Sequence, residues 1–372
     1  MNRRTRILNR LKLRQQRILD GKVNCIPSKY VRFRNDFIGI EQECYYTITS
    51  FTKGAKTQFA SDTFIFEPLM YCYHNRGKND VKLKVIYFPL EETEDRITER
   101  FMSWLLYKHT KGKIRISPRD LRSTTSAVPQ EVLDLLETPE IQDILDYFEE
   151  CVIIADEAAN PTGIYKYCVR YAEEHGTTYY KEAVRKDEFG NEIKVEVFDR
   201  YEQDNPYEYR LVVIDTINLI DTERGMDTKQ SMDKLSEYLA KYLRNRYHYS
   251  PVVIQQQAFA QESNEAFKLG RMRPSVAGLG DSKYTSRDSN VVLGLYSPFR
   301  FGQDNCEGYD IRKLRDNFRL LEVIVNRDGE MGGLCPLFFD GAVCSFTELP
   351  HPKLLSWQRY INMLRALEWL PL

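Results

Sequence analysis

The chain has 372 residues, of which 42% are hydrophobic and 29% charged, a composition typical of a soluble globular protein. This length fits one large α/β domain with additions, or two modest domains. No apolar run approaches the roughly 20 residues that cross a bilayer, and the first residues are basic and unlike a signal peptide, so we expect a cytosolic protein without a membrane partner. The net charge of −1 argues against a protein that coats nucleic acid with its whole surface, but allows a local binding channel.

The eight cysteines form no C-x-x-C pair, and the five histidines show no metal-ligand spacing. These patterns exclude the usual zinc sites and a disulfide framework. We therefore expect reduced cysteines that are mostly buried as small apolar residues.

The expected elements begin with an amphipathic helix at residues 3–20, where Leu8, Leu11, Gln15 and Ile18 form one stripe among arginines. Strands are expected at 45–49, 81–88, 151–154, 210–220, 251–255, 291–296 and 320–326. Helices are expected at 58–66, 95–107, within 117–150, from 160 to about 176, and at 229–247. Residues 179–197 alternate around a turn at 187–191, which predicts a β-hairpin. Apolar strands that alternate with helices predict a mostly parallel sheet covered on both faces.

The segment SFTKGAKT, residues 50–57, lies between an expected strand and an expected helix, where a phosphate-binding loop would stand. Phosphates need backbone N–H groups at a helix N-terminus, a lysine for the outer phosphates and a hydroxyl for Mg²⁺; Lys56 and Thr57 supply the last two. The candidate ATP-binding residues are Ser50, Thr52, Lys53, Gly54, Ala55, Lys56 and Thr57.

This loop departs from the P-loop consensus G-x-x-x-x-G-K-S/T, because Ser50 and Ala55 replace both glycines. Alone, a Lys-Thr pair after a small residue is also an ordinary helix start. A glycine lets the backbone approach phosphate closely, so we expect Ala55 to be tolerated only with a negative φ and its methyl turned away.

Asp215 follows four apolar residues of RLVVIDTINLI, residues 210–220. A carboxylate at the carboxyl end of such a strand can hold the water shell of a metal ion. An aspartate that merely caps a turn is the alternative. The loop and the acidic strand in this order predict a nucleotide-binding protein in which Thr57 and Asp215 hold Mg²⁺.

These segments in this order resemble the ATPase domain of DnaB-type (superfamily 4) hexameric replicative DNA helicases, most of all the divergent versions encoded by bacteriophages. The resemblance covers roughly residues 23–350. Besides the two elements above, it rests on VIYFPLEE (85–92), PVVIQQQ (251–257) and the segments 273–298, 322–332 and 336–346. It implies an α/β fold with a RecA-like P-loop core, ATP and Mg²⁺ as cofactors, and a homo-hexamer that moves along single-stranded DNA and unwinds duplex. Primase and a helicase loader are candidate partners.

The resemblance also assigns roles to single residues. Glu91 would activate the attacking water, Gln257 would sense the γ-phosphate, and Arg327 would be a finger for the nucleotide of a neighbouring subunit. Lys283 and Arg287 would contact DNA. Plainer alternatives stay open: Glu91 as an acid favoured by the helix dipole, a register error of one within the glutamine run, Arg327 as a hairpin cap, and two solvated loop charges.

The expected organisation is a basic linker-like helix at residues 1–22, the ATPase domain at 23–350 with a hairpin insertion at about 179–200, and a helical tail at 351–372. We expect no room for the separate N-terminal domain of the family. The family's counterpart of the first helix docks on a neighbouring subunit; a nucleic-acid-binding arm is the alternative.

Two rival functions remain open. One is a RecA- or KaiC-like ATPase that remodels or coats DNA. The other is a nucleotide-binding structural protein that does not hydrolyse, for which the altered loop is the argument.

Overall fold

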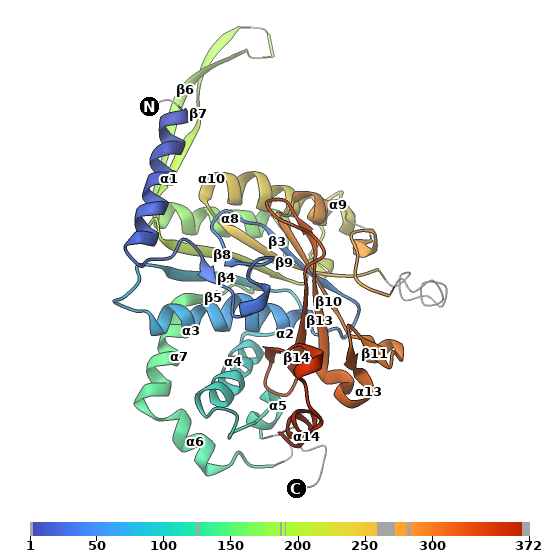
Figure 1. Ribbon diagram of the computed structural model, residues 1–372. Helices are drawn as coiled ribbons and strands as arrows, with labels where there is room; N and C mark the ends of the chain where they lie inside the picture. The colour runs from blue at the N-terminus through green and yellow to red at the C-terminus, as the bar shows by residue number, and fades with distance from the viewer. Residues whose placement is uncertain are drawn as a thin grey trace.

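The structure is a computed structural model that describes residues 3–123, 126–186, 188–189, 191–258, 272–280 and 284–366. Its central sheet has nine strands: β3 (Tyr46–Ser50), β4 (Lys82–Pro89), β5 (Val152–Ile154), β8 (Glu208–Asp215), β9 (Ser250–Gln256), β10 (Val291–Tyr296), β13 (Phe318–Asn326), β14 (Leu334–Asp340) and β15 (Ser345–Glu348). Their order across the sheet is β15-β14-β13-β10-β3-β9-β8-β4-β5 (Figure 1). The strands from β10 to β5 are parallel and the other three antiparallel, which confirms the expected sheet.

The helices are α1 (Arg3–Leu19), α2 (Lys56–Ala60), α3 (Glu67–His74), α4 (Glu94–His109), α5 (Pro118–Leu121), α6 (Gln130–Leu136), α7 (Pro139–Cys151), α8 (Pro161–Glu174), α9 (Thr228–Glu237), α10 (Asn245–Tyr247), α12 (Tyr284–Asp288), α13 (Ile311–Leu314) and α14 (Trp357–Ala366). Two π-helical segments, η2 (Ser61–Phe66) and η4 (Tyr238–Arg244), join α2 to α3 and α9 to α10. Short strand pairs form from β1 (Ile26–Pro27) with β2 (Gly39–Ile40) and from β11 (Asn305–Cys306) with β12 (Tyr309–Asp310).

The sheet is covered on both faces because its strands carry apolar residues at successive positions. In β8, Leu211 and Val213 belong to the core cluster that includes side chains of α2, α3, α4 and α7. Their neighbours Val212 and Ile214 belong to the cluster formed with α8, α9 and η4. Successive residues of a strand point to opposite faces, so an uninterrupted apolar run is what two covered faces require.

Several of the expected elements differ in extent, and the helix expected at 58–66 continues to His74. The strand expected at 210–220 ends at Asp215, and a 3-10 turn, Ile217–Leu219, follows. The hairpin is longer than expected: β6 (Gly176–Lys186) pairs with β7 (Glu192–Gln203). The sequence pattern missed its ends because the paired residues nearest the body are polar or aromatic and do not alternate clearly. All eight cysteines are free, and seven of them are buried, as expected.

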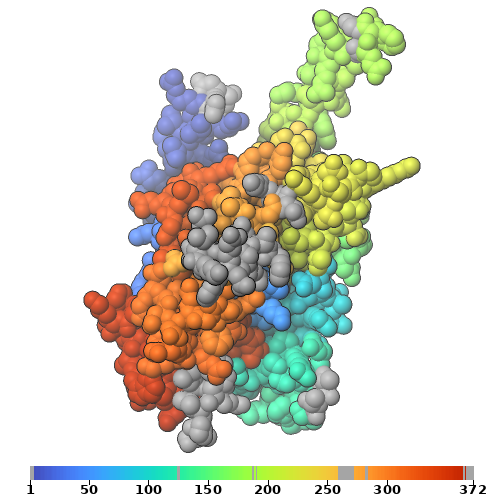
Figure 2. All heavy atoms as spheres, turned by 90° about the vertical axis from the view of Figure 1, so that its right-hand side faces the viewer, coloured from blue at the N-terminus to red at the C-terminus, as the bar shows by residue number. Residues whose placement is uncertain are grey.

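Helix α1 and the ribbon β6–β7 project from the same end of the body (Figure 1), and Figure 2 shows that they leave it separately. The last turn of α1 is fixed by Arg17, whose Nη1 donates to Asp80 at 2.7 Å and whose guanidinium lies over the ring of Tyr207. Leu8, Leu11 and Ile18 of the expected stripe are exposed. Within the described residues, no helix is long and apolar enough to cross a membrane.

Candidate nucleotide-binding site

The carboxyl ends of the parallel strands meet at one edge of the sheet. Ser50 at the end of β3 lies beside Gln256 of β9, and Pro89 of β4 lies beside Asp215 of β8. The loop after β3, the acid that ends β8 and the Glu91-Glu92 pair after β4 therefore share this edge. Ligands of open α/β sheets bind at such an edge.

The loop after β3 leads directly into a long helical run. The helix begins at Lys56 and continues through η2 and α3 to His74. No side chain caps its N-terminus, so its first N–H groups and the dipole face the loop. In the described part of the chain, the ammonium group of Lys56 has no hydrogen bond or ion pair. Bare N–H groups and an unpaired lysine at a helix start are what a phosphate requires.

The loop is packed tightly on a residue that the sequence analysis did not single out. Arg319, near the start of β13, is 1% exposed, and its Nε donates to the carbonyl of Gly54 at 3.2 Å. A Cβ on Gly54 would lie 2.5 Å from Oγ of Ser50, so only glycine fits there. The available signal for Arg319 was a lone cation inside the apolar strand FRLLEVIV, since a charge buried there needs a specific partner.

Ala55 corrects one expectation. Its φ is +70° and its ψ +29°, the left-handed conformation, and not the negative φ that we expected. Such a backbone costs an L-residue with a Cβ roughly 1–2 kcal/mol, whereas glycine adopts it freely. The conformation is required because the chain must turn from the loop into the helix at this residue.

Ala55→Gly should therefore tighten ATP binding, because glycine holds the turn without strain and removes the methyl group beside the loop. Relief of about 1 kcal/mol corresponds to roughly a fivefold lower Kd if the strain falls on the bound form. Titration of both proteins with ATP would measure it. A higher Kd in the glycine variant would mean that the loop binds phosphate in another geometry.

Thr57 and Asp215 form the polar centre of the site. Thr57 Oγ1 donates to Oδ1 of Asp215 at 2.9 Å, and the hydroxyl of Tyr87 donates to Oδ2. Asp215 is 2% exposed, and burial raises its pKa although both hydrogen bonds act in the opposite direction. The buried carboxylate carries a negative charge, and both it and the hydroxyl are oxygen ligands. The pair therefore fits a divalent cation.

The two glutamates after β4 differ in their surroundings. Glu92 forms an ion pair with Arg100 of α4, whose guanidinium is buried and also lies 3.4 Å from Oγ of Ser61. Glu91 is exposed, and in the described part of the chain its carboxylate has no protein partner. Glu91 is thus available to water at this edge, while Glu92 is engaged by a cation.

The other predicted site residues do not all lie at the loop. Gln257 is buried, and its side chain bonds Thr49 of β3. The glutamine whose side chain reaches the loop is Gln256. Arg287, on α12, is exposed with its guanidinium 3.8 Å above the ring centroid of Tyr284. Lys283 lies outside the described residues.

Arg327 lies far from the loop of its own chain. It directly follows β13, where Asn326 pairs with Val291 at the start of β10, and its guanidinium is exposed. Arg319, which contacts Gly54, is eight residues earlier in the same extended strand, roughly 26 Å away at about 3.3 Å per residue. Arg327 therefore cannot serve the nucleotide site of its own chain.

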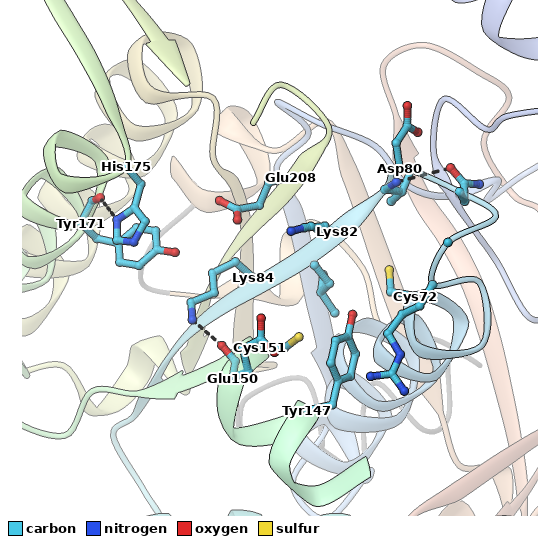
Figure 3. A pocket seen from close by; sticks show the side chains of 15 residues that line it. Cys72, Asp80, Lys82, Lys84, Tyr147, Glu150, Cys151, Tyr171, His175 and Glu208 are labelled. Carbon is cyan, nitrogen blue, oxygen red and sulfur yellow. Dashed lines mark hydrogen bonds between the residues drawn. The ribbon is translucent and has the colours of Figure 1, made fainter. Parts of the chain in front are cut away.

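A pocket of about 460 Å³, seen from close by in Figure 3, is lined by none of the residues of this site and lies at the opposite edge of the sheet. It is lined by Lys82 and Lys84 at the start of β4 and by Glu208 at the start of β8. Lys84 donates to the carbonyl of Glu150, and His175 Nδ1 bonds the carbonyl of Tyr171. Its polar groups are thus partly engaged by the protein. Among the described residues, no group of three or more His, Cys, Asp or Glu side chains is placed to hold a metal ion.

No family model matches the sequence, and no curated protein is detectably similar to it. Solved structures match in fold. A DnaB-like replicative helicase, described with its interactions with primase, superposes with a TM-score of 0.61 and 14% identity, over 89% of this chain and 64% of that chain. The isolated ATPase domain of another protein superposes with a TM-score of 0.60 and 14% identity, over 92% and 99% of the two chains.

The chain therefore has the fold of the RecA-like P-loop ATPases. Within that class it has the form found in a DnaB-like helicase, which confirms at the level of the fold the resemblance in the sequence. It spans 64% of the length of that helicase and nearly the whole of the isolated ATPase domain. At 14% identity the likeness concerns the fold alone.

Proposed function

We propose that this chain is the ATP-hydrolysing subunit of a homo-hexameric ring that translocates on single-stranded DNA and unwinds duplex, as in phage DNA replication. The observation that carries the proposal is the Thr57–Asp215 pair beneath an uncapped helix N-terminus, with Lys56, which has no partner among the described residues, beside it. The test is ATP hydrolysis by the unaltered chain with and without single-stranded DNA.

The chain's own residues divide the chemistry in the following way. The loop 50–57 binds the phosphates of ATP. Thr57 and Asp215 hold Mg²⁺, which supplies positive charge beside the phosphates. Glu91 orients the attacking water and takes its proton. Arg327 is presented to the nucleotide of a neighbouring copy, which its distance from its own loop supports.

The DNA-binding part of the proposal rests on the segment around 275–287. Arg287 and Lys283 contact the backbone of single-stranded DNA, and Gln257, which bonds Ser275, links this segment to β9. Arg287 is exposed, stacks on Tyr284 and pairs with Asp288 at 3.3 Å, so a cation and an aromatic ring, the two groups that bind single strands without sequence preference, lie together here. Binding directed at phosphates should weaken steeply with salt.

Primase or a helicase loader would be a further partner of such a ring. That part of the proposal rests on the fold alone, because the matching helicase is described with its interactions with primase.

Glu91→Gln should retain ATP binding and assembly but lower the rate of hydrolysis by roughly 10²–10⁴-fold, the usual contribution of a general base. The amide keeps the shape of the side chain but cannot accept the proton. Single-turnover hydrolysis would measure the loss. Glu92→Gln is the matched control, and because Glu92 is held by Arg100 we expect the smaller effect there. The reverse ranking would assign the base to Glu92.

The rival function, a nucleotide-binding protein that does not hydrolyse, is favoured by one observation, the left-handed backbone of Ala55. ATP binding with no turnover in the presence of Mg²⁺ and single-stranded DNA would support that rival.

A further inference from the structure

Strand β9 ends in Gln255 and Gln256, and Gln257 directly follows it, at the edge where the nucleotide loop lies. Successive side chains of an extended strand point to opposite sides. Gln255 and Gln257 therefore share one side and Gln256 faces the other. The resemblance in the sequence assigns the contact with nucleotide to Gln257. The side-chain contacts of the three glutamines do not agree with that assignment.

Gln256 is bound to the nucleotide loop. Its Nε2 donates to Oγ1 of Thr52 at 2.6 Å. Its backbone N–H donates to Oδ1 of Asn218, in the turn that follows Asp215, at 2.9 Å. Gln256 thus joins the loop after β3 to the turn after β8. Among the described residues, Thr52 is the one hydrogen-bond partner of this amide, and the half-buried side chain can exchange it when the loop moves.

Gln257 is bound to the segment that follows β9. Its Nε2 donates to Oγ1 of Thr49 at 2.9 Å and to the carbonyl of Ser275 at 3.1 Å. Its Oε1 accepts the backbone N–H of Ser275 at 3.3 Å. The amide therefore pairs with both backbone groups of one residue, as a neighbouring strand would. At 2% exposure it cannot turn away without leaving buried polar groups unpaired.

Gln255 holds the other end of the same segment. Its Nε2 donates to the carbonyl of Leu279 at 2.8 Å, and its Oε1 accepts from the hydroxyl of Thr285 on α12. Directly after Gln257, the N–H of Ala258 donates to the carbonyl of Gly278 at 2.7 Å. Hydrogen bonds thus attach the described residues on both sides of 281–283 to the end of β9 and the two residues that follow it.

We propose that Gln256 is the residue of β9 that responds to an occupied nucleotide loop, and that Gln255 and Gln257 are positioning residues that hold residues 275–280 and 284–285 for single-stranded DNA. This inference rests on the proposed function and deepens it. A change in the nucleotide loop therefore acts on β9 through Gln256, one residue before the position that the motif indicates. The change reaches the DNA-binding segment through Gln255 and Gln257, because the three residues are consecutive in the backbone.

The test compares Gln256→Ala with Gln257→Ala in steady-state ATP hydrolysis, measured without DNA and over a titration with oligo-deoxythymidine. Gln256→Ala should lower the DNA-free kcat by at least about tenfold and by a larger factor than Gln257→Ala does. Gln257→Ala should raise the DNA concentration for half-maximal stimulation by at least about tenfold and by a larger factor than Gln256→Ala does. A merely structural role would lower the DNA-free kcat and raise the DNA concentration for half-maximal stimulation together in each variant.

Thr49→Val provides a second variant in case Gln257→Ala does not fold. It is close to isosteric and removes the hydroxyl that accepts from Gln257 but no contact of Gln256. It should shift the DNA dependence in the same direction as Gln257→Ala, by a smaller factor.

Three outcomes separate the inference from the proposed function. The ranking given above supports it. An active unaltered protein in which Gln257→Ala has the larger effect on DNA-free kcat, or in which the two variants behave alike, overturns the inference and leaves the proposed function standing. An unaltered protein that binds no ATP or does not hydrolyse it overturns both.

Discussion

Lys56→Ala should lower ATP hydrolysis by roughly 10²–10³-fold, the loss that follows when one preorganised donor to a developing charge is removed. Lys56 is the first residue of the helix that begins at the loop, and its ammonium group has no partner elsewhere in the described protein. Alanine favours helix, so the helix start should persist.

The measurement is steady-state hydrolysis at saturating Mg²⁺ and ATP, with the thermal midpoint as the control for folding. Lys53→Ala is a matched comparison, because Lys53 belongs to the same loop but is exposed. Its effect should be the smaller of the two. Turnover that is unchanged in Lys56→Ala would remove the P-loop assignment.

Arg327→Ala should lower hydrolysis by roughly 10³-fold or more, the contribution of an arginine that stabilises the charge of phosphoryl transfer. Because Arg327 lies at the far edge of its own sheet, the loss should arise at the nucleotide of a neighbouring copy. Binding of ATP should change little.

Mixing this variant with Lys56→Ala tests the assignment across the interface. Each variant alone is expected to be inactive. In a head-to-tail ring assembled at random from equal amounts, roughly a quarter of the interfaces pair an intact loop with an intact finger. Part of the ATPase activity should return, whereas unwinding need not, since it requires sites coordinated around the ring. Normal hydrolysis by Arg327→Ala, or no recovery despite verified subunit exchange, would make Arg327 a hairpin cap.

The parallel sheet could be predicted from the sequence because each strand is recognisable from its own residues. The runs that became β8 and β9 are apolar at successive positions, which requires cover on both faces whatever the rest of the chain does. Thr57 and Asp215 could be brought together for the same reason, since the order of a strand, a loop and an acid-ended strand places both at one edge.

What could not be predicted depends on contacts between distant segments. The left-handed φ of Ala55 follows from the path of the loop over Gly54 and Arg319, which are 265 residues apart in sequence. The different contacts of Gln256 and Gln257 depend on which side of β9 faces the loop. A motif states the order of residue types but not the direction of a side chain, so it could not choose between adjacent glutamines.

The most direct test of the central claim is ATP hydrolysis by the unaltered chain, measured with Mg²⁺ in the absence and presence of single-stranded DNA, with the particles examined by electron microscopy in the same buffer. The account predicts hydrolysis that single-stranded DNA stimulates several-fold, a stimulation that weakens as salt is raised, and closed ring-shaped particles. Hydrolysis that is indifferent to DNA, or long filaments on DNA in place of rings, would contradict it.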